Sequence, residues 1–481
     1  MLFNSYPFLI FFIVVTSLYF IFPYHKRWLL LLLASCYFYM SFVPVYILIL
    51  GFTIVIDYFA GIEIEKAKGR QRKLFLILSL VANIGVLVFF KYFNFINFNL
   101  TFLFHSFNRN NPLPYLSILL PIGLSFHTFQ AMSYTIEVYR GNHPAEKHFG
   151  IYALYVMFYP QLVAGPIERP QNILYQFREK HNFNYQLVTS GLKLATWGLF
   201  KKVVIADRLS IVVDSVYNHP QNFNSLGLII ATVFFAFQIY CDFSGYSDMA
   251  IGIARVMGFK LMPNFNKPYQ AKSLNEFWQH WHISLSSWFR DYLYIPLGGN
   301  RVGIPRWYLN LFIVFLISGL WHGASWTFII WGALHGFYLI FALLTKNFRE
   351  KISHTLFIDK ISFLPTLTTF LLVAFAWIFF RANTVQSAFY IAGHIFTGIP
   401  DLIKNHQHLI QDYGLNNKGM ILCILLILFL ETVQYLQSKI NLVQKLMQKP
   451  FYVRWAVYYI LLILIVVFGE FSQRQFIYFQ F

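Results

Sequence analysis

The stretch NLFIVFLISGLWHGASWTFIIWGALHGFY, residues 310–338, decides the fold class of this chain. It lies within 39 consecutive residues, between Arg306 and Lys346, that contain no aspartate, glutamate, lysine or arginine. Because about 20 apolar residues in a helix cross the hydrocarbon layer of a membrane, this interval is long enough for two crossing helices. Gly319 and Gly323 permit a close helix approach or a break between them. The stretch therefore predicts two membrane helices that carry the histidines His322 and His335.

The composition of the whole chain favours the same class. Of the 481 residues, 58% are hydrophobic and only 12% are charged. A soluble domain carries about twice that charged fraction. Alternating segments of about ten residues, which are typical of a transmembrane β-barrel, do not dominate. We expect an all-α polytopic membrane protein in a single domain, residues 1–481, with about ten to twelve crossing helices plus re-entrant and interfacial segments.

The distribution of charge predicts the topology. The chain carries 37 Lys and Arg against 19 Asp and Glu, a net charge of +18. The basic residues gather in short intervals between apolar runs, as expected for residues that set topology and contact anionic membrane lipids, so no nucleic-acid partner is expected. With the basic intervals 25–27 and 63–73 in the cytoplasm, the N-terminus lies outside, residues 74–98 cross outward and residues 113–138 cross back.

Residues 242–301 differ from the apolar runs on either side. They are rich in Trp, Tyr, Ser, Asn and charge, which suits helices at the headgroup level that line a mouth. A metal site would combine His280 and His282 with Asp242 or Asp248, but the i, i+4 histidine spacing of helical zinc motifs is missing, so we expect no metal. We expect His282, Ser284 and Ser286 to line a polar cavity. Arg290 would pair with Asp291 or with a ligand anion, although a solvated interfacial face explains these charges equally well.

The two intramembrane histidines are candidates for proton transfer. Imidazole titrates near neutral pH, and burial favours its neutral form, which accepts a proton. An ionisable residue inside a membrane is a functional candidate by default. For His322 the alternative is a structural hydrogen bond to a neighbouring helix. For His335 that alternative is stronger, because the two histidines would be about 220° apart on one continuous helix.

At this point six ordered motifs carry a family resemblance. The chain resembles the membrane-bound O-acyltransferase family, and more narrowly its bacterial alginate O-acetylation branch. The resemblance spans residues 121–382, and the ending QFIYFQF is also similar to that branch. The motifs are QLVAGPI, DFSGYSDMAIG, NFNKPY, FWQHWHISLSSWFRDYLYIPLGGNR, GLWHGASWTFIIWGALHG and WIFFRA.

The resemblance implies a ring of membrane helices around a funnel or tunnel, and acyl transfer from a thioester to a hydroxyl. The family's essential histidine falls on His322 and its upstream polar position on His282. Gln279 and His280 stand where the branch usually has two arginines, so donor-headgroup contacts there are in doubt. The developing oxyanion needs hydrogen-bond donors. The candidates are Asn310, Trp321, Ser325 and Trp326.

We therefore expect a multi-pass enzyme of the bacterial cytoplasmic (inner) membrane, with acetyl-CoA or another acyl thioester as donor substrate and no permanently bound cofactor. The acceptor would be an extracytoplasmic polysaccharide, reached through a periplasmic acetyltransferase or polysaccharide-export partners. Two alternatives are D-alanyl transfer to teichoic acid from a carrier protein and a non-catalytic conduit for acyl groups. An ion-driven transporter is disfavoured, because no internal repeat and few intramembrane carboxylates are visible.

Overall fold

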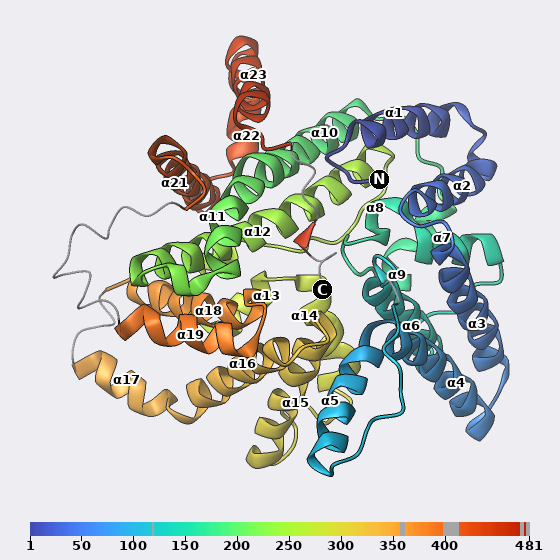
Figure 1. Ribbon diagram of the computed structural model, residues 1–481. Coiled ribbons are helices and arrows are strands. Elements are labelled where there is room, and N and C mark those ends of the chain that lie inside the picture. Colours follow the sequence, from blue (N-terminus) through green and yellow to red (C-terminus); the bar gives the residue numbers. More distant parts are fainter. Residues whose placement is uncertain (118–119, 356–360, 398–412, 472–475, 478–481) are drawn as a thin grey trace.

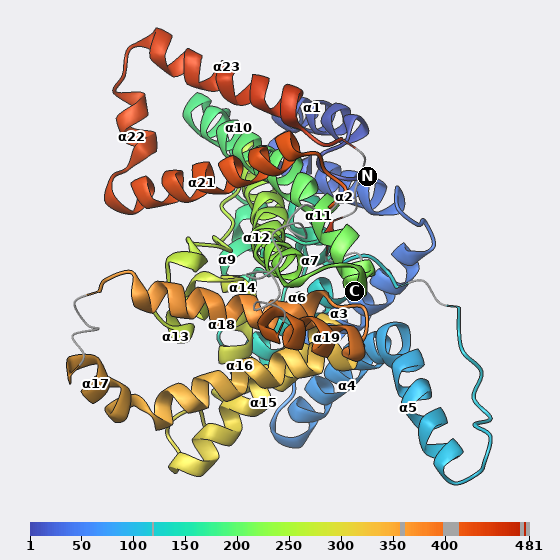
Figure 2. The same ribbon diagram turned by 60° about the vertical axis from the view of Figure 1, so that its left-hand side comes forward.

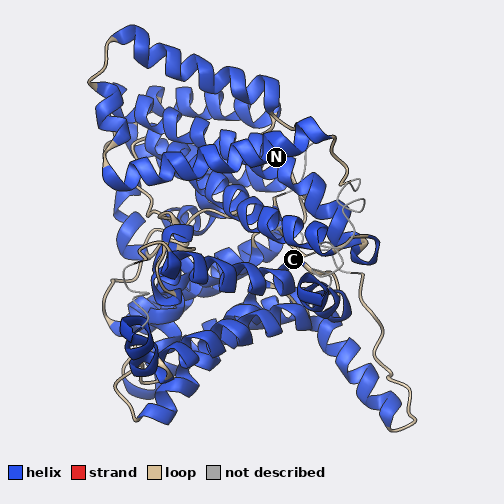
Figure 3. Cartoon of the chain, turned by 90° about the vertical axis from the view of Figure 1, so that its left-hand side faces the viewer, coloured by secondary structure: helices blue, strands red, loops and turns tan. Residues whose placement is uncertain are grey.

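Helices dominate the computed structural model, which describes residues 1–117, 120–355, 361–397, 413–471 and 476–477 (Figure 1). No strand occurs among these residues (Figure 3). Eight of the described helices are long and apolar enough to cross a membrane, and Tyr6–Ile21 is a shorter apolar helix. The all-α polytopic class is confirmed. Eight is fewer than the ten to twelve expected, partly because apolar residues near 151–165 form short buried helices instead of a span.

The N-terminal third contains one long interrupted helix. α4, a π-helical turn at Val88–Tyr92 and α5 follow one another without a gap, and Figure 2 shows α5 extending away from the body. The return crossing begins later than residue 113, because residues 109–117 are not helical and α6 starts at Leu124, after Gly123 in a left-handed conformation (φ 74°). The helices are α1 (Tyr6–Ile21), α2 (Arg27–Met40), α3 (Tyr46–Lys66), α4 (Gly69–Leu87), α5 (Phe93–Ser106) and α6 (Leu124–Arg140).

The middle of the chain corrects the expectation of an interfacial segment from residue 242. The motif DFSGYSDMAIG lies inside the 32-residue helix α12, and nearly all of its residues are buried. Its carboxylates are tolerated there because Asp242 pairs with Lys202 at 2.5 Å and Asp248 pairs with Lys201 at 2.8 Å. The helices are α7 (Phe149–Met157), α8 (Tyr159–Leu162), α9 (Pro170–Ile173), α10 (Tyr185–Phe200), α11 (Asp207–Asn218) and α12 (Ser225–Val256).

Residues 310–338 form parts of two helices, as expected. α15 ends at His322, Gly323 and Ala324 break the helix, and Ser325 caps the start of α16 by accepting from the Thr327 N–H. Figure 1 shows these helices beside α13, α14 and α18. Their bounds are α13 (Leu274–His280), α14 (Ile283–Phe289), α15 (Ile304–His322), α16 (Trp326–Leu344) and α18 (Leu364–Arg381).

The C-terminal helices lie at the periphery, but the chain then returns to the core. Most α23 side chains are exposed, as suits a lipid-facing helix. Phe476 is buried, and the Ile477 N–H donates to Asp242 Oδ2 at 2.7 Å; the other residues of the ending QFIYFQF lie outside the described residues. The remaining helices are α17 (Lys346–Thr355), α19 (Val385–Thr397), α21 (Asn417–Lys439), α22 (Leu442–Met447) and α23 (Phe451–Phe468).

Two glycines let α15 and α16 touch. A Cβ atom at Gly319 would lie 2.3 Å from the carbonyl oxygen of Phe328, and one at Gly332 would lie 2.3 Å from that of Phe315. Both obstacles are backbone atoms, which cannot rotate away. The close approach at Gly319 is one helical turn from His322, so it fixes where that histidine lies.

We expect Gly319→Val and Gly332→Val each to destabilise the protein by about 1–3 kcal/mol, because the new side chains force the two helices apart. The measurement is the midpoint of thermal unfolding in detergent. Gly85→Val is the matched control, since a Cβ atom at the exposed Gly85 meets nothing within 4 Å. Equal midpoints for all three variants would contradict the close approach.

Candidate active site

His322 occupies the last position of α15 and is only 3% exposed. Its ring contacts the rings of Trp321, Trp331 and Phe380 at centroid distances of 4.9, 5.0 and 5.3 Å. It also lines a cavity of about 40 Å³. The cavity's other walls come from the π-helical turn, the entry to α6 and Val163. They are Lys91, Leu120, Pro121, Ile122, Gly123, Leu124, Ser125, Phe126, Val163 and Trp321.

His282 precedes α14 and is fully buried. Its backbone is left-handed (φ 43°, ψ 54°), a conformation that is uncommon for a residue with a side chain. Burial lowers the pKa of His282 to about 3, so its ring is neutral. The strained backbone and the buried polar ring are typical of functional positions.

Asn264 holds this histidine in place. Its Oδ1 lies 3.1 Å from His282 Nδ1 and accepts hydrogen bonds from the Ser284 hydroxyl at 2.9 Å and the Ser284 N–H at 3.2 Å. Its Nδ2 donates to Ser247 Oγ at 3.2 Å. Asn264 was not predicted as a site residue. The available signal was its place in the motif NFNKPY.

Trp321 brings the two histidines together. Its ring lies 4.9 Å from the His322 ring and 6.2 Å from the His282 ring. Phe126 covers the same group, with its ring 6.0 Å from that of His282 and 5.4 Å from that of Trp321. The indole Nε1–H of Trp321 is buried without a hydrogen-bond partner among the described residues. Trp321 is thus a donor that a substrate oxygen could use.

Three of the predicted oxyanion donors do not reach His322. Asn310 lies twelve residues earlier on α15, about 18 Å along the helix, and donates to the carbonyls of Leu297 and Gly299, both at 3.1 Å. The Trp326 indole donates to Asn99 on α5 at 2.9 Å, and its side chain is exposed. Ser325 caps α16. These residues shape the fold around the break between the two helices.

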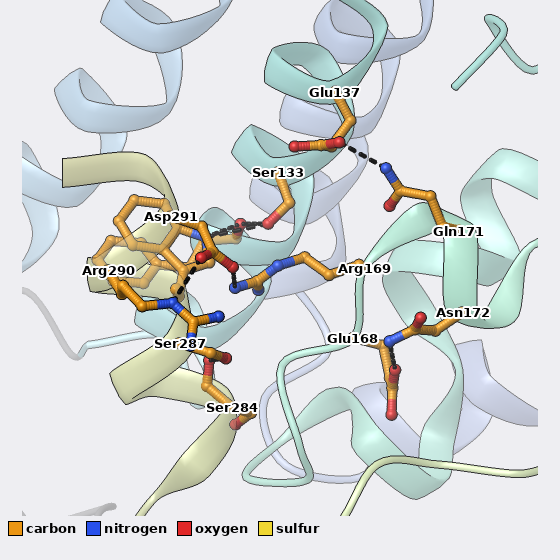
Figure 4. A network of polar contacts seen from close by, with 12 residues as sticks. Ser133, Glu137, Glu168, Arg169, Gln171, Asn172, Ser284, Ser287, Arg290 and Asp291 are labelled. Carbon is orange, nitrogen blue, oxygen red and sulfur yellow. Dashed lines mark hydrogen bonds and ion pairs between the residues drawn. The ribbon is translucent and has the colours of Figure 1, made fainter. Parts of the chain in front are cut away.

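Arg290 and Asp291 belong to a separate polar network, shown in Figure 4. Arg290 Nε pairs with Asp291 Oδ1 at 2.8 Å, as predicted, and Arg169 approaches Asp291 Oδ2 at 3.7 Å. Arg140 donates to the Asp291 carbonyl at 2.9 Å. Arg140 is the last residue of α6, at the end that the charge pattern predicts to be cytoplasmic. Beside the network, burial raises the pKa of Glu168 to about 7. Of the predicted site residues, Arg290 and Asp291 therefore form a charged group apart from the cavity at His322.

His335 lies outside the cavity but shares a neighbour with His322. The Trp331 ring is 5.0 Å from both histidine rings, and the Trp278 ring is also 5.0 Å from His335. Both ring nitrogens of His335 are buried without a hydrogen-bond partner among the described residues. The break after α15 is what allows Trp331 to contact both histidines.

Lys91 is the second site residue that the sequence did not predict. It lies in the π-helical turn of the long helix, lines the cavity and donates to the carbonyls of Trp321 at 2.8 Å and His322 at 3.0 Å. The available signal was an isolated lysine inside the apolar crossing 74–98, since such residues are rare in membrane helices unless they serve a function.

The arrangement suits proton transfer in a nearly dry site. An imidazole, an ammonium group and an unpaired indole N–H surround one cavity, so a proton acceptor and two donors face the same space. Among the described residues, no group of three or more His, Cys, Asp or Glu side chains could hold a metal ion. Asp242 and Asp248 pair with lysines.

Comparison with known proteins agrees with these features. The profile of MBOAT, the membrane-bound O-acyltransferase family, matches residues 144–380. The chain is 40% identical to a peptidoglycan O-acetyltransferase of Helicobacter pylori, over 76% of this chain and 72% of that protein. It is 41% identical to a probable alginate O-acetylase of Pseudomonas aeruginosa, over 81% and 73%. It is 28% identical to a teichoic acid D-alanyltransferase of Bacillus subtilis, over 52% and 64%.

We expect Asn264→Leu to lower both stability and activity, because it leaves the buried Ser284 hydroxyl and amide without their acceptor. Each buried donor left unpaired costs about 1–3 kcal/mol. The measurement is the thermal midpoint of the purified protein, together with its rate of acyl transfer. Asn266→Leu is the control, since the Asn266 side chain is exposed. A midpoint for Asn264→Leu equal to that of the control would show that Asn264 does not hold this site together.

Proposed function

Because the chain belongs to the membrane-bound O-acyltransferase family and is an O-acyltransferase, we propose that it transfers acetyl groups from a cytoplasmic thioester towards hydroxyls of an extracytoplasmic polysaccharide. The observation that carries the proposal is the placement of His322. Its imidazole lies at the end of a membrane helix and lines a cavity with Lys91 and Trp321. In this account, His322 is the general base.

The proposed reaction has two proton transfers at one side chain. As the acceptor oxygen attacks the thioester carbonyl, its proton passes to the neutral His322 imidazole. When the C–S bond breaks, the imidazolium returns that proton to the departing thiolate, so charge and protons balance. General-base assistance of this kind is typically worth about 10²- to 10⁴-fold in rate.

The apolar surroundings have a role in the same reaction. Trp321, Trp331 and Phe380 surround His322, which limits access of water that would otherwise hydrolyse the thioester. Trp321 Nε1 and Lys91 are the nearest candidate donors to the oxyanion that forms on the carbonyl. Holding donor and acceptor in line can contribute about 7–11 kcal/mol through orientation.

The donor and acceptor sides follow from charge and from the relatives. The ion pair between Lys147 and Glu65 places the interval after α6 beside the basic loop after α3, and Arg140, at the end of α6, contacts Asp291. We assign this end to the cytoplasm, which puts the N-terminus outside, and acetyl-CoA is the proposed donor substrate. The named relatives act on peptidoglycan and alginate, which supports a polysaccharide acceptor in the bacterial inner membrane system and a periplasmic acetyltransferase as partner.

D-alanyl transfer to teichoic acid is the second candidate. It is supported by the D-alanyltransferase of Bacillus subtilis, but at 28% identity over about half of this chain. The O-acetyltransferase relatives match more of the chain at higher identity. Competition between acetyl-CoA and a D-alanyl carrier protein, supplied to the purified protein, separates the two.

We expect His322→Ala to lower the rate of transfer from labelled acetyl-CoA by about 10²- to 10⁴-fold, because no other histidine and no carboxylate lines the described cavity. The measurement is O-linked acetyl on the exported glycan, with the amount of membrane protein determined in parallel. His105→Ala, at an exposed position near the end of α5, is the control. Unchanged acetylation by His322→Ala at a normal protein level would rule out His322 as the base and favour a non-catalytic conduit.

A further inference from the structure

Two adjacent side chains of the π-helical turn, Lys91 and Tyr92, donate hydrogen bonds to the end of α15. Lys91 Nζ donates to the carbonyls of Trp321 and His322 at 2.8 and 3.0 Å. The Tyr92 hydroxyl donates to the carbonyl of Leu320 at 2.7 Å. Three consecutive carbonyls at the end of one membrane helix thus receive their hydrogen bonds from one turn of another, more than 220 residues away in sequence.

These hydrogen bonds answer a specific physical need. The last four carbonyls of an α-helix have no partner within that helix. Because Trp321 and His322 are buried, water has little access to these carbonyls, and a buried carbonyl without a donor destabilises the protein. Lys91 and Tyr92 supply the donors.

The π-helical turn itself points to a functional position. Such turns are rare, occur mostly as single insertions within α-helices and are frequent at functional sites. Here the turn covers Val88–Tyr92, so both Lys91 and Tyr92 lie within it. A regular α-helix would separate the directions of consecutive side chains by about 100°. The extra residue in the turn narrows that angle, which helps both side chains reach the same helix end.

The Lys91 side chain also lines the cavity. Its third polar contact is with Ser125 Oγ at 3.4 Å, the longest of the three contacts of Nζ. Ser125 and His322 line the same cavity. Lys91 Nζ also lies 5.9 Å from the centroid of the Trp321 ring. Lys91 therefore fixes the backbone of His322 and places an amino group beside the cavity where the reaction is proposed to occur.

We propose that Lys91, together with Tyr92, is a positioning residue that holds the end of α15 so that His322 meets the substrates in the cavity. The proposal rests on the proposed role of His322 as base. A positioning role differs from a purely structural one in its effect on kinetics. Loss of these hydrogen bonds moves the His322 imidazole relative to the thioester, so it lowers kcat more than it raises KM. A misplacement of about 1 Å can cost about 10²-fold in rate.

The test uses the full-length protein in lipid nanodiscs, with release of the coenzyme A thiol from acetyl-CoA in the presence of an alginate oligosaccharide as the readout. We expect Lys91→Met to lower kcat about 10- to 100-fold while KM for acetyl-CoA changes less than about threefold. Lys91→Arg keeps the hydrogen-bond donors, so its kcat is expected to exceed that of Lys91→Met at least about threefold. Tyr92→Phe, which removes a single hydroxyl, lowers kcat about 3- to 10-fold.

Lys193→Met is the matched control, because Lys193 lies on α10, does not line the described cavity, and its Nζ contacts Met447 Sδ and the Tyr458 ring. Wild-type kcat in Lys91→Met or in Tyr92→Phe would overturn the proposal. So would a rise in KM that accounts for the whole loss of kcat/KM. If Lys91→Met fails to fold, Tyr92→Phe decides the question: a kcat loss of about 3- to 10-fold supports the proposal, and wild-type kcat overturns it.

His322→Ala in the same assay tests the proposed role of His322 as base separately from the positioning role of Lys91 and Tyr92. If His322→Ala abolishes turnover and the variants of Lys91 and Tyr92 do not reduce it, only the positioning role is wrong. If His322→Ala keeps the wild-type rate, the proposed function of His322 is wrong and the positioning role falls with it.

Discussion

The carbonyl groups of Leu320, Trp321 and His322 need hydrogen-bond donors at a place where burial limits access of water. They lie at the end of α15, where Gly323 takes an extended conformation and the helix stops. Lys91 and Tyr92 supply the donors, so the helix can end among buried side chains. Everything else at the site depends on that break, because it places His322 at a helix end next to a cavity.

The second histidine shows the same constraint solved in another way. His282 and Ser284 are fully buried, and one amide, Asn264, supplies the acceptor that both need. Farther along the chain, Asp242 lies in the middle of α12 because Lys202 neutralises it. Buried polar groups of this kind are stable only when each one has a partner. In the cavity, the Trp321 indole N–H has no hydrogen-bond partner among the described residues, and it is a proposed contact for a substrate oxygen.

The sequence was most informative where the signal is local. Thirty-nine residues without Asp, Glu, Lys or Arg predicted the helix pair, and a histidine among them, His322, lines the described cavity. The motif WHISL predicted His282, which the structure brings to Trp321. Arg290 and Asp291 are adjacent in sequence, so their ion pair could also be anticipated.

The sequence was least informative where a contact joins distant segments. Lys91 lies some 230 residues before Trp321 and His322, to whose carbonyls it donates. The periodicity of its own helix does not predict that contact. Asn310 lies in the same apolar stretch as His322, yet helix geometry carries it away from the site. The motif DFSGYSDMAIG looked interfacial because of its polarity, whereas its charges are neutralised by two lysines of the π-helical turn Lys201–Ala206, which follows α10. Pairing of this kind depends on the fold.

The central claim, that a thioester and an acceptor meet at His322, is tested most directly by an experimental structure of the protein with a non-hydrolysable acetyl-CoA analogue. The account predicts that the carbonyl carbon lies beside the cavity, with the His322 ring within hydrogen-bonding reach, about 3 Å, of the attacking oxygen's position. Lys91 Nζ would still donate to the carbonyls of Trp321 and His322 at the end of α15. An analogue whose acetyl group stops at the outer network of Arg169 and Asp291, away from His322, would contradict the account.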